Sequence, residues 1–172
     1  CMLVDNDPAT GGGNKHCVLN DAFYHSLKAR VSAGEFCAIL AAPPCSTFSI
    51  GRFYPNGPPV VRNRADIIGL SVAPKKHRRE LLEANALVAR TCTLRRCGWD
   101  VGSQWMLENP VDRGDRSLAR SYLHAEHGPM WLMPDVTSLE AHCSAQRVDF
   151  SQCMLGAPWQ KRTSIMYSAG FE

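Results

Sequence analysis

The chain has 172 residues, of which 45% are hydrophobic and 20% are charged, and its formal net charge is +3. This length and composition predict one globular domain with a hydrophobic core. No apolar run approaches the roughly 18 residues of a membrane span and no signal-peptide pattern is present, so we expect no membrane partner. The net charge is too small to indicate a partner by itself.

The eight cysteines are scattered and include no C-x-x-C pair; they occupy positions 1, 17, 37, 45, 92, 97, 143 and 153. Structural zinc sites usually place cysteines in such pairs. We therefore expect reduced thiols in an intracellular protein, nuclear if the source is a eukaryote, and no bound metal. A thiol-rich module that binds metal through its cysteines is the alternative from another functional class.

The first part of the chain predicts a strand, a loop and a helix. Residues 1–4 (CMLV) are apolar and precede the turn sequence DNDP, so they predict a strand. The glycines at 11–13 indicate a flexible loop, and residues 16–20 (HCVLN) indicate a short strand. Residues 21–31 have apolar side chains at helical spacing and predict a helix with Asp21 as its N-cap.

A lone cysteine follows the next predicted strand. Residues 36–42 (FCAILAA) have the length and composition of a buried strand. Pro43 and Pro44 must end it, because proline lacks the hydrogen-bond donor that a strand ladder uses. Cys45 therefore sits on a stiff turn at the exit of a strand, ahead of a loop rich in glycine and proline at 51–59.

A long helix is predicted after a basic run. Residues 75–79 (KKHRR) precede apolar residues at helical spacing, which predict a helix over 79–96 that ends at Gly98. Cations at the start of a helix oppose its dipole. The run therefore either binds a phosphate partner or is a solvated helix start, and the sequence leaves both interpretations open.

The remaining segments complete an alternation of strands and helices. Residues 103–110 (SQWMLENP) predict a strand that ends at Glu108, 127–136 predict a loop with hydrophobic anchors, and 162–168 predict a late strand. The alternation predicts an α/β domain with an open, mostly parallel sheet. Ligands gather at the carboxyl ends of strands in such sheets. Four residues with polar or reactive side chains fall at predicted strand ends: Asp5, Asp21, Cys45 and Glu108.

Taken singly, these four residues have ordinary interpretations as a turn former, a helix cap, a buried thiol and a solvated carboxylate. Together they indicate a reaction. A thiolate is a strong nucleophile, and a nearby carboxyl group can protonate or hydrogen-bond a ring nitrogen of an electron-poor heterocycle. Thiolate addition to carbon 6 of cytosine makes carbon 5 nucleophilic enough to accept a methyl group, and Cys45 with Glu108 has the chemistry for that reaction.

Three short motifs, in this order, resemble those of the cytosine-5 DNA methyltransferases that use S-adenosylmethionine. Residues 43–49 (PPCSTFS) resemble the Pro-Cys nucleophile loop, 108–110 (ENP) the Glu-Asn-Val motif, and 160–166 (QKRTSIM) the Gln-x-Arg-x-Arg motif. Upstream, Asp5 and Asp21 match the acidic residues for the ribose and adenine of the cofactor. The resemblance covers nearly the whole chain and implies a Rossmann-like methyltransferase fold.

The resemblance also implies a role for each matching residue. The catalytic residues would be Cys45 as nucleophile, Glu108 at the amino group and ring nitrogen 3 of cytosine, and Arg162 beside the loop or the DNA. S-adenosylmethionine would be bound by Asp5, Asn6, Asp21 and Ala22. The substrate is a base flipped out of DNA, and it would be contacted by Pro44, Ser46, Thr47, Ser49, Asn109 and Gln160, with Asn109 bracing the nucleophile loop.

The chain departs from the family pattern at several points. Ser164 stands where the family has its second arginine, and Pro110 replaces valine. The glycine-rich cofactor loop that precedes Asp5 in the family lies outside the sequence, as does the target-recognition segment that follows Phe171. We therefore expect residues 1–172 to be a single catalytic-core fragment, incomplete at both ends.

Two further interpretations stay open beside methylation of DNA. One is methylation of cytosine in RNA, because a related branch with the same motifs acts on transfer RNA. The other is a degenerate, non-catalytic module of a mobile-element or viral polyprotein. Ser164 and the missing segments favour the degenerate module, whereas the intact Cys45 and Glu108 oppose it. An isolated fragment of this kind would bind the cofactor weakly, if at all.

Overall fold

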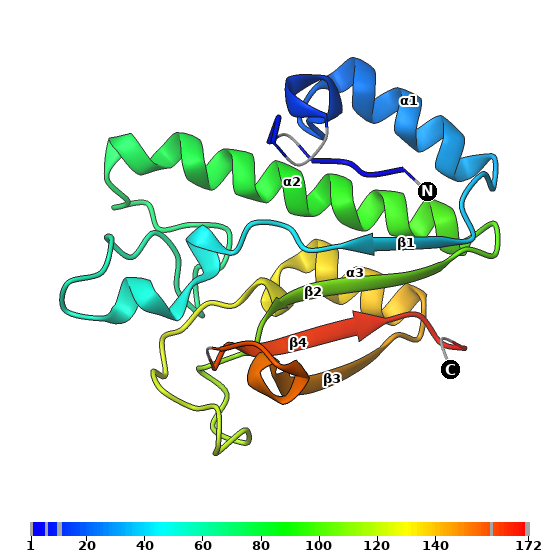
Figure 1. The fold of residues 1–172 in the computed structure, drawn as a ribbon. Helices are drawn as coiled ribbons and strands as arrows, with labels where there is room; N and C mark the ends of the chain where they lie inside the picture. The colour runs from blue at the N-terminus through cyan, green and yellow to red at the C-terminus, as the bar shows by residue number, and fades with distance from the viewer. Residues whose placement is uncertain (1, 6, 10–11, 159, 171–172) are drawn as a thin grey trace.

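The computed structural model describes residues 2–5, 7–9, 12–158 and 160–170. These residues form a mixed α/β structure built on an open four-stranded sheet (Figure 1). The helices are α1 (Asp21–Ser32), α2 (Lys75–Trp99) and α3 (Pro134–His142), and the strands are β1 (Ala38–Ala41), β2 (Gln104–Pro110), β3 (Gln146–Ser151) and β4 (Arg162–Tyr167). Short 3-10 helices lie at Gly13–His16, Ser46–Phe48, Ile50–Phe53, Met130–Leu132 and Gln152–Leu155.

The sheet has the strand order β1-β2-β4-β3 and mixes both kinds of pairing. β1 is parallel to β2, whereas β4 is antiparallel to both of its neighbours, β2 and β3. The open α/β class is confirmed, but the prediction of a mostly parallel sheet is wrong for the described strands. Residues 152–161 connect β3 to β4 and are too few for a helical crossover, so these two strands pair in the antiparallel direction.

The main core lies between one face of the sheet and the helices α2 and α3. Trp105 and Leu107 of β2 are fully buried and share a hydrophobic cluster with Val88 of α2 and Leu139 of α3. α1 packs against α2 on the side farther from the sheet (Figure 1), and its buried residues, including Leu27, belong to a second cluster. α2 is therefore the central helix, with the sheet below it and α1 above it.

The first residues do not form the two strands that their composition predicts. Residues 2–5 have no regular secondary structure, and Met2 and Val4 pack against the cluster around α1. Residues 13–16 form a 3-10 helix, so the strand expected over 16–20 is also wrong. Apolar side chains reach a core from an irregular segment as well as from a strand, and composition does not separate the two cases.

The predicted helix over 21–31 is confirmed as α1, but its cap differs. The N-cap is Asn20, whose side chain accepts a hydrogen bond from the Phe23 amide at 3.1 Å. Asp21 is the first helical residue instead of the cap. An asparagine satisfies a free amide at a helix start as well as an aspartate does, so Asp21 is left for another contact.

α2 is longer than predicted at both ends. It begins at Lys75, directly after Pro74, so the basic run forms the first turns of the helix instead of preceding it. Gly98 is buried within the helix and does not end it. A Cβ at position 98 would meet the Ile39 side chain of β1 at 2.6 Å, so glycine allows α2 and β1 to approach closely here.

The strands predicted before Cys45 and up to Glu108 are confirmed as β1 and β2, but the burial of β1 and the end of β2 differ from the prediction. β1 lies at the edge of the described sheet, and Leu40 is 69% exposed, so β1 is not the buried strand that its composition predicts. β2 is the more buried of the two parallel strands and continues past Glu108 to Pro110. The predicted late strand is confirmed as β4.

The segment 127–136, expected to be a loop with hydrophobic anchors, is partly a helix. Its anchors are confirmed, since Met130 and Trp131 are 0% and 2% exposed. From Pro134 the chain continues into α3, which the sequence analysis does not predict, and then into β3.

In the part of the chain that the structure describes, no helix combines the length and the apolar character of a bilayer-spanning segment.

We predict that the two parallel strands differ sharply in their sensitivity to truncation. Leu107→Ala should lower the free energy of unfolding by about 2 to 5 kcal/mol, because it leaves a cavity in a fully buried strand. Leu40→Ala, the matched change on the exposed side of β1, should cost less than about 0.5 kcal/mol. Urea unfolding of both variants measures the difference, and equal losses would contradict the described burial of the two strands.

Candidate active site

The sheet brings the three predicted catalytic residues to the edge that is formed by the carboxyl ends of its two parallel strands. β1 and β2 are parallel neighbours, so both end at this edge, and the antiparallel strand β4 starts there. The Arg162 carbonyl accepts a hydrogen bond from the Val111 amide at 3.2 Å, which ties the start of β4 to the end of β2. Cys45, on the loop after β1, and Glu108, near the end of β2, therefore share an edge with Arg162.

The loop that carries Cys45 turns sharply. Pro43 is buried and Pro44 is exposed, and the half-buried Cys45 (φ −92°, ψ 4°) leads into the 3-10 helix Ser46–Phe48. The Phe48 amide donates to the Cys45 carbonyl at 2.9 Å and closes this turn. We call residues 43–49 the Cys45 loop. Its thiol is held at the exit of β1, as the double proline predicts.

Asn109 ties this loop to β2. Its side chain is 1% exposed, and Nδ2 donates to the Pro43 carbonyl oxygen at 3.0 Å. Side chains alternate along a strand, so Asn109 points to the buried face of β2 while Glu108 points to the opposite face. The adjacent pair Glu108 and Asn109 can therefore serve a ligand and the loop separately.

Arg62 supports the loop through hydrogen bonds to neutral acceptors and has no hydrogen-bonded carboxylate. Its Nη2 donates to Thr47 Oγ1 at 3.0 Å, its Nη1 donates to the Ile67 carbonyl at 2.6 Å, and its guanidinium lies 3.9 Å from the centre of the Phe48 ring. Burial lowers the pKa of Arg62 to about 10. Thr47 is only 2% exposed, so its hydroxyl faces the protein interior and not a substrate, contrary to the expectation from the resemblance.

His127 also supports this loop. It is 1% exposed, and its Nδ1 accepts a hydrogen bond from the Arg113 amide at 3.0 Å. Nε2 therefore carries the hydrogen and donates to the Phe48 carbonyl at 2.9 Å. Sequence analysis does not find this residue, because no spacing or motif relates His127 to a loop 79 residues away.

Glu108 faces a cationic segment. Its Oε1 lies 3.1 Å from Lys161 Nζ, and about a quarter of the Glu108 side chain is exposed. Gln160 is exposed and Arg162 is half-buried on either side of this lysine. Arg113 lies near enough to Arg162 for the two charges to interact, and burial together with this repulsion lowers the pKa of Arg113. Lys161 lies within the motif at 160–166, but the resemblance gives it no role.

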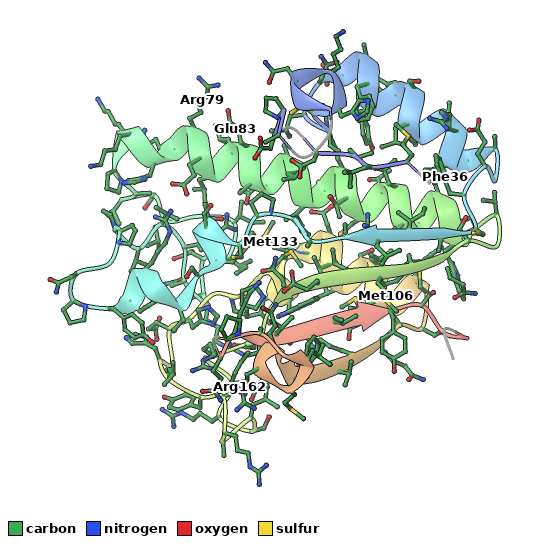
Figure 2. All side chains as sticks on the ribbon, viewed as in Figure 1. Phe36, Arg79, Glu83, Met106, Met133 and Arg162 are labelled. Carbon is green, nitrogen blue, oxygen red and sulfur yellow. The ribbon has the colours of Figure 1, made fainter. Side chains whose placement is uncertain are left out.

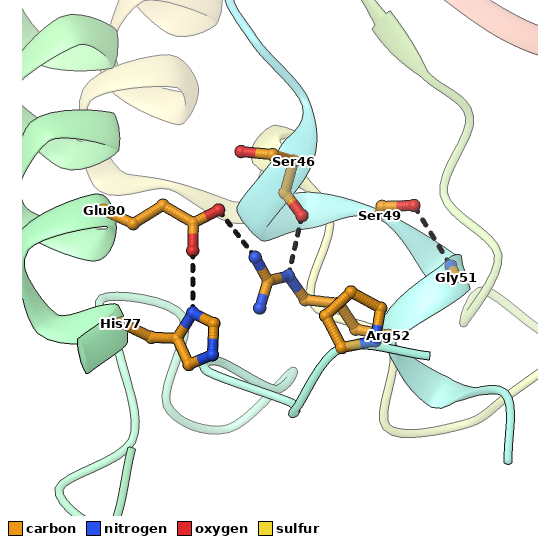
Figure 3. Close-up of a pocket in the computed structure, with 7 residues that line it drawn as sticks. Ser46, Ser49, Gly51, Arg52, His77 and Glu80 are labelled. Carbon is orange, nitrogen blue, oxygen red and sulfur yellow. Dashed lines mark hydrogen bonds and ion pairs between the residues drawn. The ribbon is translucent and has the colours of Figure 1, made fainter. Parts of the chain in front are cut away.

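A cavity of about 470 Å³ opens beside the Cys45 loop (Figure 3). Ser46 and Ser49, two of the predicted substrate contacts, line it. Ser49 uses its hydroxyl to accept from the Gly51 amide at 3.1 Å, whereas Ser46 is exposed. The other residues that line the cavity are Gly51, Arg52, Pro58, His77 and Glu80.

A chain of hydrogen bonds crosses one wall of this cavity. Arg52 Nε donates to the Ser46 carbonyl at 2.7 Å, and Arg52 Nη2 lies 2.6 Å from Glu80 Oε1 (Figure 3). His77 Nδ1 lies 3.1 Å from Glu80 Oε2. Burial by itself would raise the pKa of Glu80, but the hydrogen bonds from His77, Arg52 and Ser46 outweigh it and lower this pKa. Glu80 is therefore held as a carboxylate.

Two of the four residues that the resemblance assigns to S-adenosylmethionine make contacts within the chain. Asp21 forms an ion pair with Arg90 of α2, which lowers the pKa of Asp21. Asp5 Oδ1 accepts a hydrogen bond from the backbone amide two residues later at 2.8 Å. Ala22 is exposed on α1, and Asn6 lies outside the described residues. Asp5 and Asp21 therefore make contacts within the chain, and their assignment to the cofactor stays a prediction.

The cysteines of the described segments are all free thiols, at positions 17, 37, 45, 92, 97, 143 and 153. Burial raises the pKa of the Cys92 thiol to about 12, which makes it an inert core residue. No three histidine, cysteine, aspartate or glutamate side chains in those segments are grouped as metal ligands. The described part of the chain thus offers no candidate metal centre for the alternative of a metal-binding module.

Comparison with known proteins adds no relative: the chain matches no family profile, and no curated protein or solved structure is significantly similar to it.

Asp112 provides a test of how the supports of the loop depend on pH. Burial alone would raise its pKa, but the hydrogen bonds from the Gly114 amide and Arg64 outweigh burial and hold the pKa below the ordinary value of 3.8. A lowered carboxylate pKa stabilises the folded state above 3.8, and this contribution is lost as the pH falls through the lower folded value.

We therefore expect Asp112→Asn to be less stable than the native protein at neutral pH and to lose less stability between about pH 5 and about pH 2. Arg64→Gln should flatten the same pH dependence, since it removes a cation that favours the Asp112 carboxylate. Urea unfolding across this range measures both effects. An unchanged slope in both variants would show that the ion pair does not hold the Asp112 carboxylate.

Proposed function

We propose that the chain transfers a methyl group from S-adenosylmethionine to carbon 5 of cytosine in DNA, through a covalent adduct of Cys45 with a flipped base. One observation carries the proposal: Asn109 fastens the loop that carries Cys45 to β2, at the edge where β1 and β2, the strand that carries Glu108, both end. A thiol, a carboxylate and a fixed loop at one sheet edge are what the proposed addition requires.

In the proposed reaction, the Cys45 sulfur forms a bond to carbon 6 of the ring, and the electron pair moves toward carbon 5 and ring nitrogen 3. A proton passes from the Glu108 carboxyl group to nitrogen 3, and a Glu108 oxygen accepts a hydrogen bond from the exocyclic amino group. The contact with Lys161 holds the Glu108 side chain in place before the base arrives. Carbon 5 then takes the methyl group of S-adenosylmethionine, whose sulfonium leaves as a neutral thioether. Loss of the carbon 5 hydrogen as a proton to solvent, cleavage of the bond to sulfur and return of the nitrogen 3 proton to Glu108 restore the aromatic ring and the free thiol.

Basic side chains at this edge support a nucleic acid partner. Lys161 directly precedes β4, and Arg162 is its first residue. Arg113 lies near Arg162, on the segment that follows β2. Cations gathered at one edge attract phosphates irrespective of sequence. We propose DNA as the partner from the resemblance, with RNA as the alternative, and a Rossmann-like arrangement for the complete catalytic core.

A degenerate, non-catalytic module is the second candidate, and two observations favour it. Ser164 Oγ donates to Asp149 at 2.5 Å, so the position of the second family arginine is occupied by a polar contact between β3 and β4. Asp21 already forms an ion pair with Arg90, which a cofactor contact would have to share. Such a module would keep affinity for nucleic acid but would form no adduct.

The decisive test uses the 172-residue chain, S-adenosylmethionine and DNA that contains 5-fluorocytosine, followed by denaturing mass spectrometry. Fluorine blocks the final elimination, so a true enzyme stays bound to its substrate. We expect an adduct that carries DNA and one methyl group at Cys45. Cys45→Ser should abolish this adduct, whereas Cys153→Ser, the matched change at an exposed thiol, should retain it. No adduct with folded protein that binds S-adenosylmethionine, as measured by calorimetry, would favour the non-catalytic module, and an adduct with RNA alone would favour the RNA substrate.

Glu108→Gln tests the proposed proton chemistry. The amide keeps the shape of the side chain but cannot supply a proton to nitrogen 3, so we expect the rate of methyl transfer to fall by about 10² to 10⁴. Single-turnover transfer to an unmodified oligonucleotide measures the rate. A rate equal to that of the native protein would remove Glu108 from the mechanism without removing Cys45.

A further inference from the structure

We propose that Arg52, held by Glu80 and His77, is a positioning residue for the Cys45 thiol. The inference deepens the proposed methyl transfer and rests on it for its catalytic consequence. Neither the motifs nor the resemblance gives a role to these three residues. The contacts that carry the proposal are those of the cavity wall in Figure 3.

Arg52 joins three separate parts of the chain through one buried guanidinium. Its side chain is 5% exposed. Besides the Ser46 carbonyl and Glu80, it donates from Nη1 to the Pro59 carbonyl at 2.8 Å. Arginine suits this task because its planar group presents several donors in fixed directions. The Cys45 loop, the segment that leaves it and the start of α2 are therefore fixed to one rigid group.

The contact with Ser46 acts on the carbonyl of the residue directly after the nucleophile, in the Ser46–Thr47 peptide. The other supports hold neighbouring positions: Asn109 holds Pro43, Arg62 holds Thr47, and His127 holds Phe48. The hydrogen bond from Arg52 fixes the Ser46 carbonyl between them. Because that carbonyl fixes the backbone of the residue next to Cys45, its orientation limits where the thiol can point.

Glu80 and His77 hold Arg52 from α2. The two oxygens of Glu80 are used separately, one by Arg52 and one by His77. A carboxylate only accepts hydrogen bonds, so Nδ1 of His77 carries the hydrogen. His77 thereby orients the carboxylate that orients Arg52, and the three side chains form one relay from the first turns of α2 to the Cys45 loop.

The same helix provides a matched control pair. Arg79 and Glu83 are joined by an ion pair of 2.7 Å, but their side chains are 88% and 47% exposed. In Figure 2 both project from the side of α2 that faces away from the sheet. Glu83→Gln removes the same chemical group as Glu80→Gln, three residues away, without touching the relay.

The test compares Glu80→Gln, Arg52→Lys and Glu83→Gln by two measurements on the full chain. The first is kcat and KM for methyl transfer. The second is the rate of alkylation of Cys45 by iodoacetamide, read by peptide mass spectrometry against the exposed Cys153 in the same sample. Thermal unfolding of each variant verifies the fold.

We expect Glu80→Gln and Arg52→Lys to lower kcat about tenfold or more, since a small displacement of a reacting group is enough for such a loss. KM should stay within about twofold, because the proposed role of the relay is to orient Cys45 and not to bind the substrate. The ratio of Cys45 to Cys153 alkylation should change in both variants, and Glu83→Gln should match the native protein in every measurement.

Each outcome decides the proposal. If folded Glu80→Gln and Arg52→Lys match Glu83→Gln in kcat and in Cys45 alkylation, the positioning role is refuted, even if methyl transfer is real. If the native chain transfers no methyl group, the proposed function fails, and the alkylation ratio alone decides whether the relay positions the thiol. If Glu80→Gln does not fold, His77→Gln, which leaves the Arg52–Glu80 pair intact, must show a smaller change of the same kind, and no change refutes the proposal.

Discussion

The hydrogen bond from Asn109 to the Pro43 carbonyl joins the two parallel strands beyond the last pair of their ladder. The position of the nucleophile depends on this contact, because β1 has only four residues and its outer side has no strand in the described sheet. Proline at position 43 ends the ladder yet leaves its carbonyl free to accept. A short edge strand is thereby held in register with the buried β2, and the loop after it leaves the sheet in a fixed direction.

The polar groups under the Cys45 loop are costly to bury. Arg52, Arg62 and His127 are each at most 7% exposed, and only Arg52 forms an ion pair there with a carboxylate. Apolar side chains of the same size would fill this space at a smaller cost in desolvation. What the polar groups add is direction, since each one fixes a particular carbonyl or hydroxyl of the loop. Buried polar groups that cost more than apolar packing concentrate at functional sites, which is consistent with the role proposed for Cys45.

Sequence reasoning predicted the elements that local patterns determine and missed those that distant partners determine. The helical spacing before Ser32, the double proline after β1 and the apolar run of β2 are local, and the corresponding elements are present. Residues 2–5 have the composition of a strand but pack as an irregular segment. Asp21 is separated from Arg90 by 69 residues, and no pattern near either residue indicates that they pair. The supports of the Cys45 loop were hidden for the same reason, with Asn109 as the exception, because it lies inside a motif.

The buried guanidinium of Arg62 has a consequence for how the molecule opens. Its hydrogen bonds join the loop at Thr47, the segment at Ile67 and Asn85 of α2. Releasing the loop by itself would leave this cation without its acceptors, in a site that water does not reach. The loop, the segment to residue 67 and the middle of α2 therefore form one cooperative unit whose amides exchange with solvent together. A surface turn with so many irregular residues should then exchange as slowly as the helix beneath it.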